Sequence, residues 1–240
     1  VNRYVKLINR AILDESIKGV VLLVDSGGGY ADYVEEIYSD LLELNMSKPL
    51  VASAIRALSG GYYIAVACKY IYVQNSSLIG SVGAIGFLPP ILIPSEITIE
   101  SGPHKWTGRS ILSGYYSLNQ VVDNFVAAVK EGRGSRLKIS ETELRKATVY
   151  LGCEAIKLGL ADGPGGLQKA ISKAAEMAGL VKYRVEELSI EKEAPSKPSG
   201  NTSALYEDNV TLEMLMKLHP PPSFYYIYLP SKAVQSEALS

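Results

Sequence analysis

Apolar residues along the first part of the chain switch between helical spacing and short continuous runs. A helix is predicted at residues 1–18, and Gly19 ends it. The continuous apolar run that follows, residues 20–24, is typical of a strand buried on both faces. A second helix and a second apolar run are predicted at residues 31–44 and 49–54. The chain therefore begins with alternating helices and strands.

The alternation continues through the next hundred residues. Further helices are predicted at residues 59–68, 121–130, 141–147, 153–158 and 167–178, and further strands at residues 71–73 and 97–100. Alternating strands and helices predict an α/β fold, with a mostly parallel sheet and flanking helices. Active sites of such folds lie at the carboxyl ends of the strands. Two glycine-rich turns, residues 25–29 and 56–61, are therefore expected on one rim of the sheet.

The composition changes after residue 182. Residues 183–204 are rich in Glu, Lys, Pro and Ser, which predicts a flexible linker between a domain at residues 1–182 and a tail at residues 205–240. The tail contains an aromatic and aliphatic stretch at residues 224–229. Because such a stretch is rarely left in water, we expect the tail to dock on the domain or on a neighbouring subunit.

Composition narrows the class of protein. Hydrophobic residues make up 47% and charged residues 20%, with a formal net charge of -1, so we expect a soluble packed core and no nucleic-acid partner. No apolar run approaches the roughly 18 residues that a membrane helix needs. The chain starts at Val1 without a signal-peptide pattern, so we expect an upstream membrane anchor to be absent from it. Cys68 and Cys153 are interpreted as core thiols, with a disulfide left open.

Ser59 is the first candidate for chemistry. It precedes Gly60 at a strand-to-helix turn, where its hydroxyl can act as a nucleophile and the Gly60 amide can hold an oxyanion. Gly28 or Gly29 can supply a second amide, because glycine lets the backbone approach a substrate closely. The alternatives are that Ser59 only caps a helix and that the glycines only form a turn. A phosphate-binding loop is discounted, because no Gly-Lys-Ser/Thr follows the glycines.

A serine nucleophile needs a base, and the chain has two histidines. His219 lies in the proline-rich tail, which leaves His104 or its neighbour Lys105. A lysine acts as a base only when burial lowers its pKa toward neutrality, and apolar neighbours such as Trp106 favour that. The alternative is that Lys105 is an ordinary surface charge.

Several motifs, in this order, resemble those of the signal peptide peptidase A family, membrane-linked Ser–Lys proteases with a ClpP/crotonase-like fold. The motifs are Asp-Ser-Gly-Gly-Gly at 25–29, Ser-Gly-Gly-Tyr-Tyr-Ile-Ala at 59–65, Gly-Ser-Val-Gly at 80–83, Gly-Pro-His-Lys at 102–105, and two later helical signatures at 125–133 and 150–162. The resemblance implies Ser59 as nucleophile, Lys105 as general base and Ser81 as the residue that orients the lysine amine. Gly27 departs from the family pattern, which has proline there.

The resemblance also implies a function: a serine endopeptidase that hydrolyses cleaved signal peptides or other apolar segments, without cofactor or metal. It further implies a homo-oligomer, associated with a membrane at its extracytoplasmic face. Three alternatives remain at this stage. They are a related membrane-associated serine protease that cleaves stomatin-like proteins, a non-proteolytic crotonase-like acyl-CoA enzyme, and an inactive scaffold.

Overall fold

The computed structural model describes residues 2–87, 101, 108, 110–188 and 223–227. The strand predicted at residues 97–100, the linker from residue 189 onward and Lys105 lie outside these described residues.

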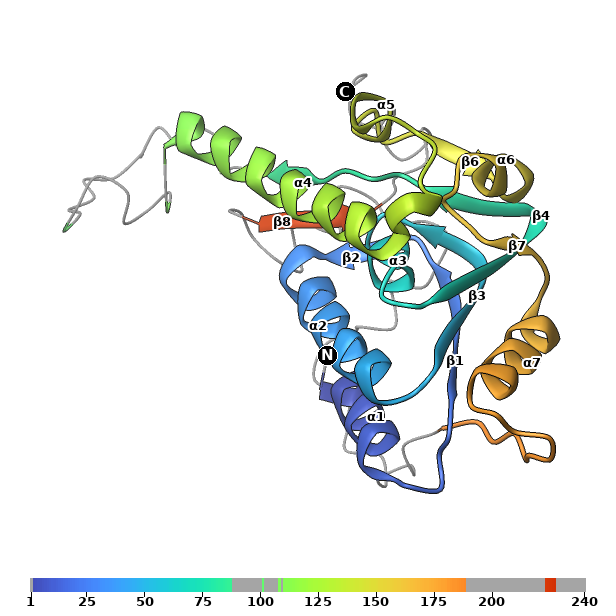
Figure 1. Cartoon of the computed structure of the whole chain (residues 1–240). Helices are drawn as coiled ribbons and strands as arrows, with labels where there is room; N and C mark the ends of the chain where they lie inside the picture. Colours follow the sequence, from blue (N-terminus) through green and yellow to red (C-terminus); the bar gives the residue numbers. More distant parts are fainter. Residues whose placement is uncertain (1, 88–100, 102–107, 109, 189–222, 228–240) are drawn as a thin grey trace, which may run out of the picture.

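A mostly parallel sheet forms the centre of the domain (Figure 1). Its strands, in spatial order, are β1 (Val20–Ser26), β3 (Leu50–Leu58), β4 (Tyr70–Gly80) and β6 (Val149–Leu151), and the short β7 (Gly163–Pro164) also pairs with β4. The pairs β1–β3, β3–β4 and β4–β7 are parallel, and β6 is antiparallel to β4. The α/β class predicted from the alternating pattern is confirmed.

Helices cover both faces of this sheet. On one side lie α1 (Asn2–Leu13), α2 (Ala31–Ser47), α3 (Gly60–Ala65) and the long α4 (Ile111–Arg133), and on the other side lies α7 (Leu167–Met177) (Figure 1). The short helices α5 (Glu141–Leu144) and α6 (Gly152–Lys157) follow the 3-10 turn η1 (Gly134–Arg136).

The two faces of the sheet bury separate groups of apolar side chains. The larger core lies under α2, α3 and α4 and includes Leu44, Tyr63 and Phe125. The smaller core lies under α7, where Val51 and Ala170 are fully buried. This layered burial holds the carboxyl ends of β1, β3 and β4 at one rim.

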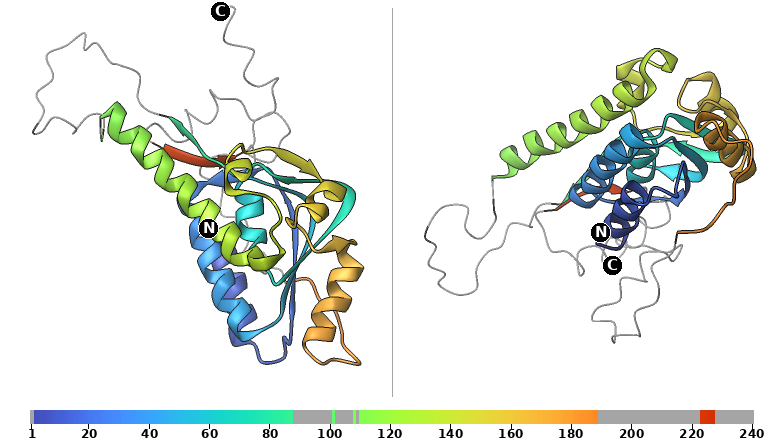
Figure 2. Two further views of the ribbon diagram at one scale, coloured as in Figure 1. Left: turned by 45° about the horizontal axis from the view of Figure 1, so that its top comes forward. Right: turned by 60° about the horizontal axis from the view of Figure 1, so that its bottom comes forward.

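A second, smaller sheet lies beside that rim (Figure 2). Its order is β2 (Gly28–Tyr30), β8 (Ser223–Ile227) and β5 (Ile85–Phe87), and β8 is antiparallel to both neighbours. The middle strand therefore comes from the far end of the chain.

Three local predictions differ from the structure. The first helix ends at Leu13, because the Asp14 carboxylate accepts hydrogen bonds from the Ser16 amide and hydroxyl and so starts a turn. The strand β1 is an edge strand of its sheet, and Leu23 is 53% exposed, so the expected burial on both faces is wrong. The strand β4 reaches from residue 70 to residue 80, well beyond its apolar run.

Two further observations concern the cysteines and the question of a membrane-spanning helix. Both cysteines are free, Cys68 buried and Cys153 half-buried. None of the helices in the described part of the chain combines the length and the apolar character that crossing a membrane requires.

Candidate active site

Ser59 lies at the junction of β3 and α3 with an unusual backbone conformation. Its φ is 51° and its ψ is -122°, a combination that costs a non-glycine residue about 1–3 kcal/mol. The conformation is held from two sides: the Ser59 amide donates to the Gly80 carbonyl at 2.8 Å, and the Ser59 carbonyl accepts from the Tyr62 and Tyr63 amides. Ser59 occupies the N-cap position of α3, but its side chain makes no capping hydrogen bond. Helix capping therefore does not account for a serine here.

Ser81 leaves β4 in the same way that Ser59 leaves β3. The preceding residues, Leu58 and Gly80, are partners in the parallel ladder. Ser81 also has a positive φ, 55°, and its amide donates to the Thr148 carbonyl at 3.0 Å. Ser59 is 1% exposed and Ser81 is 9% exposed. Two buried serines thus leave neighbouring strands at one rim of the sheet, both with positive φ.

The two glycine-rich turns meet at this rim, as predicted. Ser26, at the end of β1, is the ladder partner of Ala57 in β3. A Cβ atom on Gly61 would lie 2.7 Å from the Ser26 carbonyl oxygen, so the approach of α3 to the end of β1 requires glycine. Gly28 has a φ of 113°, which also favours glycine.

The candidate oxyanion-hole glycines begin two elements that contact each other, α3 and β2. Gly60 begins α3, and Gly28 and Gly29 begin β2. The Gly28 amide donates to the Ser26 hydroxyl at 3.2 Å, so part of its hydrogen-bonding capacity is used within its own turn. Gly29 is the ladder partner of Tyr226 in β8. The oxyanion role of the three glycines stays a prediction.

The predicted general base lies outside the described residues. Lys105 and both histidines, His104 and His219, belong to segments that the structure does not describe. Within the described part, no group of three or more His, Cys, Asp or Glu side chains could hold a metal ion. The position of Lys105 relative to Ser59 therefore stays a prediction, whereas the structure describes the backbone around Ser59.

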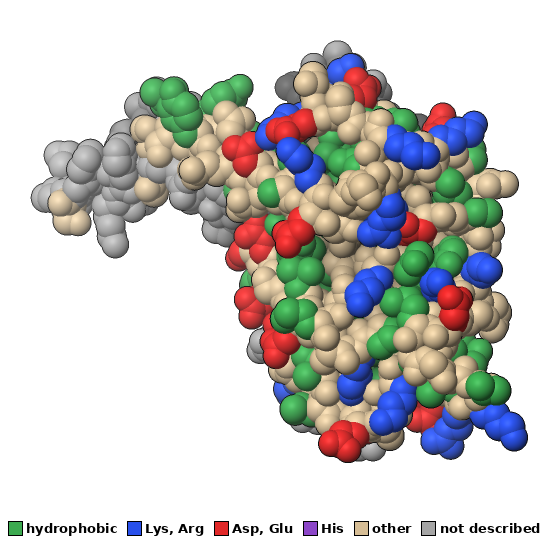
Figure 3. Space-filling model, in the orientation of Figure 1, with side chains coloured by type: hydrophobic (Ala, Val, Ile, Leu, Met, Phe, Trp, Pro, Cys, Tyr) green, Lys and Arg blue, Asp and Glu red, His purple; other side chains and the backbone are tan. Residues whose placement is uncertain are grey.

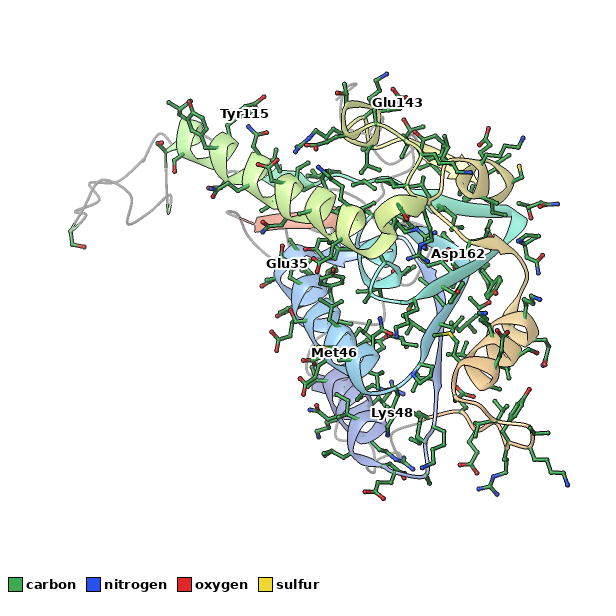
Figure 4. The ribbon with its side chains drawn as sticks, viewed as in Figure 1. Glu35, Met46, Lys48, Tyr115, Glu143 and Asp162 are labelled. Carbon is green, nitrogen blue, oxygen red and sulfur yellow. The ribbon has the colours of Figure 1, made fainter. Side chains whose placement is uncertain are left out.

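Sequence reasoning missed a buried charge cluster close to α3. The Arg133 side chain, at the end of α4, is 0% exposed and donates two parallel hydrogen bonds of 2.9 Å to the two carboxylate oxygens of Asp162. Arg136 donates a further bond of 2.9 Å to the same carboxylate, and the Ile71 amide donates one of 2.7 Å. Figure 4 shows Asp162 close to the end of α4. The cluster joins the two late segments that the resemblance singled out, 125–133 and 150–162.

The arginines of the charge cluster lower the pKa of Asp162. Burial by itself raises the pKa of Asp162, but the hydrogen bonds and positive charges of Arg133 and Arg136, with the Ile71 amide, outweigh burial and leave the pKa below 3.8. Asp162 is therefore a permanent anion at neutral pH, which the buried Arg133 needs as its partner.

Tyr62 connects the nucleophile segment to this cluster. It is the third residue of α3, fully buried, and its hydroxyl donates to the Leu160 carbonyl at 2.8 Å. Burial raises the pKa of Tyr62 well above its ordinary value, so the hydroxyl stays neutral. The helix that follows Ser59 is thus anchored to the loop that carries Asp162.

The first half of α4 extends away from the sheet (Figure 1). Figure 3 shows hydrophobic side chains gathered at its projecting end, and the exposed residues there are Leu112, Tyr115 and Tyr116. Figure 4 places the Tyr115 side chain on this free end. Large side chains of this kind in one exposed group are typical of contact surfaces.

The sequence matches known proteases. The model of peptidase family S49 matches residues 43–89, the segment that runs from the end of α2 through Ser59 and Ser81 to β5. A putative protease of Synechocystis sp., slr0021, is 29% identical over 228 residues, covering 87% of this chain and 82% of the relative. The chloroplastic serine protease SPPA of Arabidopsis thaliana is 26% identical over 221 residues, covering 83% of this chain.

The chain spans a different share of each relative. It spans 82% of the length of the Synechocystis protein but only 32% of the length of the Arabidopsis protein. Among solved structures, a membrane-bound stomatin-specific protease in complex with a substrate peptide is 18% identical, with a TM-score of 0.46 over 72% of this chain and 71% of that one.

Proposed function

Because the chain belongs to the signal peptide peptidase A family of serine proteases, we propose that it hydrolyses peptide bonds with Ser59 as nucleophile and Lys105 as general base. The observation that carries this proposal is the backbone of Ser59: a non-glycine residue with positive φ, in a strand-to-helix turn, with no capping role. Strained turns of this kind present a nucleophilic hydroxyl at the carboxyl edge of a sheet.

In the proposed mechanism, the uncharged Lys105 amine accepts the Ser59 hydroxyl proton while Ser59 Oγ attacks the peptide carbonyl carbon. The Gly60 amide and the Gly28 or Gly29 amide stabilise the resulting oxyanion. The Lys105 ammonium then gives its proton to the leaving amine, and an acyl-enzyme remains on Ser59. Water hydrolyses the acyl-enzyme by the same route, with Lys105 again as the base. Ser81 acts as a positioning residue for the lysine amine.

The sequence motif around Lys105 supports an amine rather than an imidazole as the base. Each of the two histidines lies in a segment next to proline, and the Gly-Pro-His-Lys motif places Lys105 where the family has its lysine. The titratable side chains of α3, which begins directly after Ser59, are Tyr62 and Tyr63, and burial raises the pKa of each. A tyrosine with a raised pKa stays protonated and cannot serve as a base at neutral pH.

The assay compares peptidase activity of the full chain with that of two variants, Ser59→Ala and Lys105→Ala, on fluorogenic peptides with aliphatic residues at the cleavage site. Each variant is expected to lose about 1,000-fold or more of the activity, because the dyad acts as a unit. Matched controls are Ser172→Ala and Lys182→Ala, which change exposed residues outside the site and should keep wild-type activity. Full activity in Ser59→Ala would overturn the proposal.

The proposed substrates are cleaved signal peptides or other apolar segments. The related possibility, cleavage of stomatin-like proteins, uses the same dyad and is separated by comparing signal peptides with stomatin carboxyl-terminal segments as substrates. A crotonase-like acyl-CoA enzyme would instead act on a CoA thioester. Hydrolysis of peptides in the same assay that leaves acyl-CoA untouched supports the protease.

We further propose that the chain forms a homo-oligomer that works at a membrane. The exposed group of Leu112, Tyr115 and Tyr116 on the projecting end of α4 supports contacts between subunits, since aromatic side chains dominate the energetics of such interfaces. Membrane association rests on the family resemblance.

A further inference from the structure

Three non-glycine residues in the described part of the chain have a positive φ, and all three lie at the rim that carries the candidate nucleophile. They are Ser59, with a φ of 51°, Ser81, with 55°, and Ala147, with 54°. Ala147 belongs to the turn between α5 and β6, and the proposed mechanism gives it no role. Because backbone strain is concentrated at functional sites, the conformation of Ala147 indicates a function for this turn.

One peptide unit, between Gly80 and Ser81, connects this turn to Ser59. Its carbonyl, from Gly80, accepts the hydrogen bond of 2.8 Å from the Ser59 amide. Its N–H, from Ser81, donates to the Thr148 carbonyl at 3.0 Å. The carbonyl and the N–H of a planar trans peptide unit point in opposite directions and rotate together. The Thr148 carbonyl therefore fixes the orientation in which the Gly80 carbonyl meets the Ser59 amide.

Two glycines allow the turn to lie this close to Ser81. The Thr148 carbonyl oxygen lies against Gly80, where a Cβ atom would be 2.7 Å away from it. The Ala147 Cβ atom lies 3.0 Å from the place that a Cβ atom on Gly83 would take. Gly80 and Gly83 are the first and last residues of the Gly-Ser-Val-Gly motif at 80–83. The turn and the motif around Ser81 are therefore in direct contact.

The end of helix α5 explains part of this arrangement. A left-handed residue is common just after a helix, although glycine usually occupies that position. The Ala147 amide donates to the Leu144 carbonyl, the last residue of α5, at 3.2 Å. The end of the helix does not explain why the next carbonyl, from Thr148, holds the peptide unit between the two serines. That contact indicates a role in the active site.

We propose that Ala147 and Thr148 are positioning residues of the active site: through the Gly80–Ser81 peptide unit, they set the places of Ser59 and of Ser81. The inference rests on the proposed function and deepens it, because it names residues on which the geometry of the reacting serine depends. A misplacement of about 1 Å can slow a reaction about 100-fold, and a shift of a few tenths of an ångström correspondingly less. Movement of the turn should therefore slow the chemical step and leave substrate binding largely intact.

The test is a double-mutant cycle on the peptidase activity of the full chain. Gly83→Ala adds a methyl group 3.0 Å from the Ala147 Cβ atom, so the turn must give way. Ala147→Gly removes that Cβ atom and suits the positive φ of the position. The values of kcat and KM are measured on the fluorogenic peptides for wild type, both single variants and the double variant.

Gly83→Ala is expected to lower kcat about ten-fold or more and to leave KM within about three-fold of the wild-type value. In the chain that already carries Ala147→Gly, the same substitution should lower kcat less than about two-fold, because the contact is gone. Equal losses of kcat with and without Ala147→Gly, or no loss in Gly83→Ala, would overturn the inference.

The matched control is Gly134→Ala, at a glycine with a φ of 51° and no neighbour within 4 Å of an added Cβ atom. It strains the backbone outside the 147–148 turn, so it should lower the thermal unfolding midpoint and leave kcat unchanged. Thermal unfolding also checks that each variant is folded. Ala147→Val is a second probe, because a β-branched side chain opposes a positive φ, and it should lower kcat in the same way as Gly83→Ala.

The outcomes separate this inference from the proposed function. A wild-type chain without peptidase activity would remove the proposed function, and the positioning role with it, even if the unfolding midpoints of the four chains show the contact. An active wild-type chain in which Gly83→Ala and Ala147→Gly act independently on kcat would remove only the positioning role.

Discussion

The Ser59 amide donates a hydrogen bond of 2.8 Å to the carbonyl of Gly80. This bond joins the candidate nucleophile, which directly follows β3, to the last residue of β4, directly before Ser81. Gly80 has a φ of 113°, and a Cβ atom placed there would lie 2.7 Å from the Thr148 carbonyl oxygen. The position of Ser59 therefore depends on a glycine in the neighbouring strand.

Gly80→Ala should destabilise the fold and lower activity together. The added methyl group collides with backbone, and alanine disfavours the φ of this position, so we expect a loss of about 2 kcal/mol or more in the free energy of unfolding. Urea denaturation measures it. The matched control is Gly27→Ala, where a Cβ atom would have no neighbour within 4 Å and stability should change by less than about 1 kcal/mol. Equal stability of the two variants would contradict the packing described around Gly80.

Asp162→Asn should be far more damaging than the loss of an exposed carboxylate. Removing the charge leaves Arg133 buried without a counter-ion, which costs about 3–5 kcal/mol of unfolding free energy. The control is Asp25→Asn, which breaks the exposed pair with Arg56 at 3.1 Å and should cost less than about 1 kcal/mol. Both are measured by urea denaturation at pH 7. Similar losses of unfolding free energy in the two variants would show that the Arg133–Asp162 pair does not stabilise the fold as expected.

The same carboxylate predicts how stability depends on pH. The pKa of Asp162 is lowered in the folded state, so between that pKa and the ordinary value of 3.8 the unfolded chain binds the proton and the folded chain does not. The stability that the charge supplies is present above pH 3.8 and is lost as the pH falls through the folded pKa. The difference in unfolding free energy between wild type and Asp162→Asn should be constant at neutral pH and shrink below pH 3.8. A difference that grows on acidification would contradict the direction of the shift.

Charges on the projecting end of α4 should disrupt the proposed oligomer. Tyr115→Glu places a carboxylate in the exposed aromatic group, where burial against another subunit would be costly. We expect light scattering to show a shift from an oligomer toward the monomer mass of 26.0 kDa. Met46→Glu is the control, since Met46 is also highly exposed but lies on α2 (Figure 4). An oligomer unaffected by Tyr115→Glu, or a wild-type chain that is already a monomer, would contradict the proposed interface.

The surroundings of Ser59 were predictable because their signals are local. An apolar run, a serine and two glycines follow one another in the chain, and this order is sufficient to predict a strand, a turn and a helix. The approach of the two glycine-rich turns also followed, since parallel strands end at the same rim.

Other features depend on contacts that no local pattern reveals. The Arg133–Asp162 pair joins residues 29 positions apart, and an isolated Arg or Asp in a sequence is normally read as a surface charge. The length of β4 was missed because its middle is polar. There the Ser77 hydroxyl donates to the Ala54 carbonyl and accepts from the Gln74 amide, and these bonds bridge the irregularity in the ladder.

Labelling of the nucleophile tests the Ser59–Lys105 dyad most directly. A peptidyl fluorophosphonate reacts with an activated serine: the Oγ–P bond forms, fluoride leaves and the base takes the hydroxyl proton. Mass spectrometry should find the adduct on Ser59, at a rate that rises from neutral to alkaline pH in the wild type and falls at least 100-fold in Lys105→Ala. An adduct on another residue, or equal labelling rates in wild type and Lys105→Ala, would contradict the dyad.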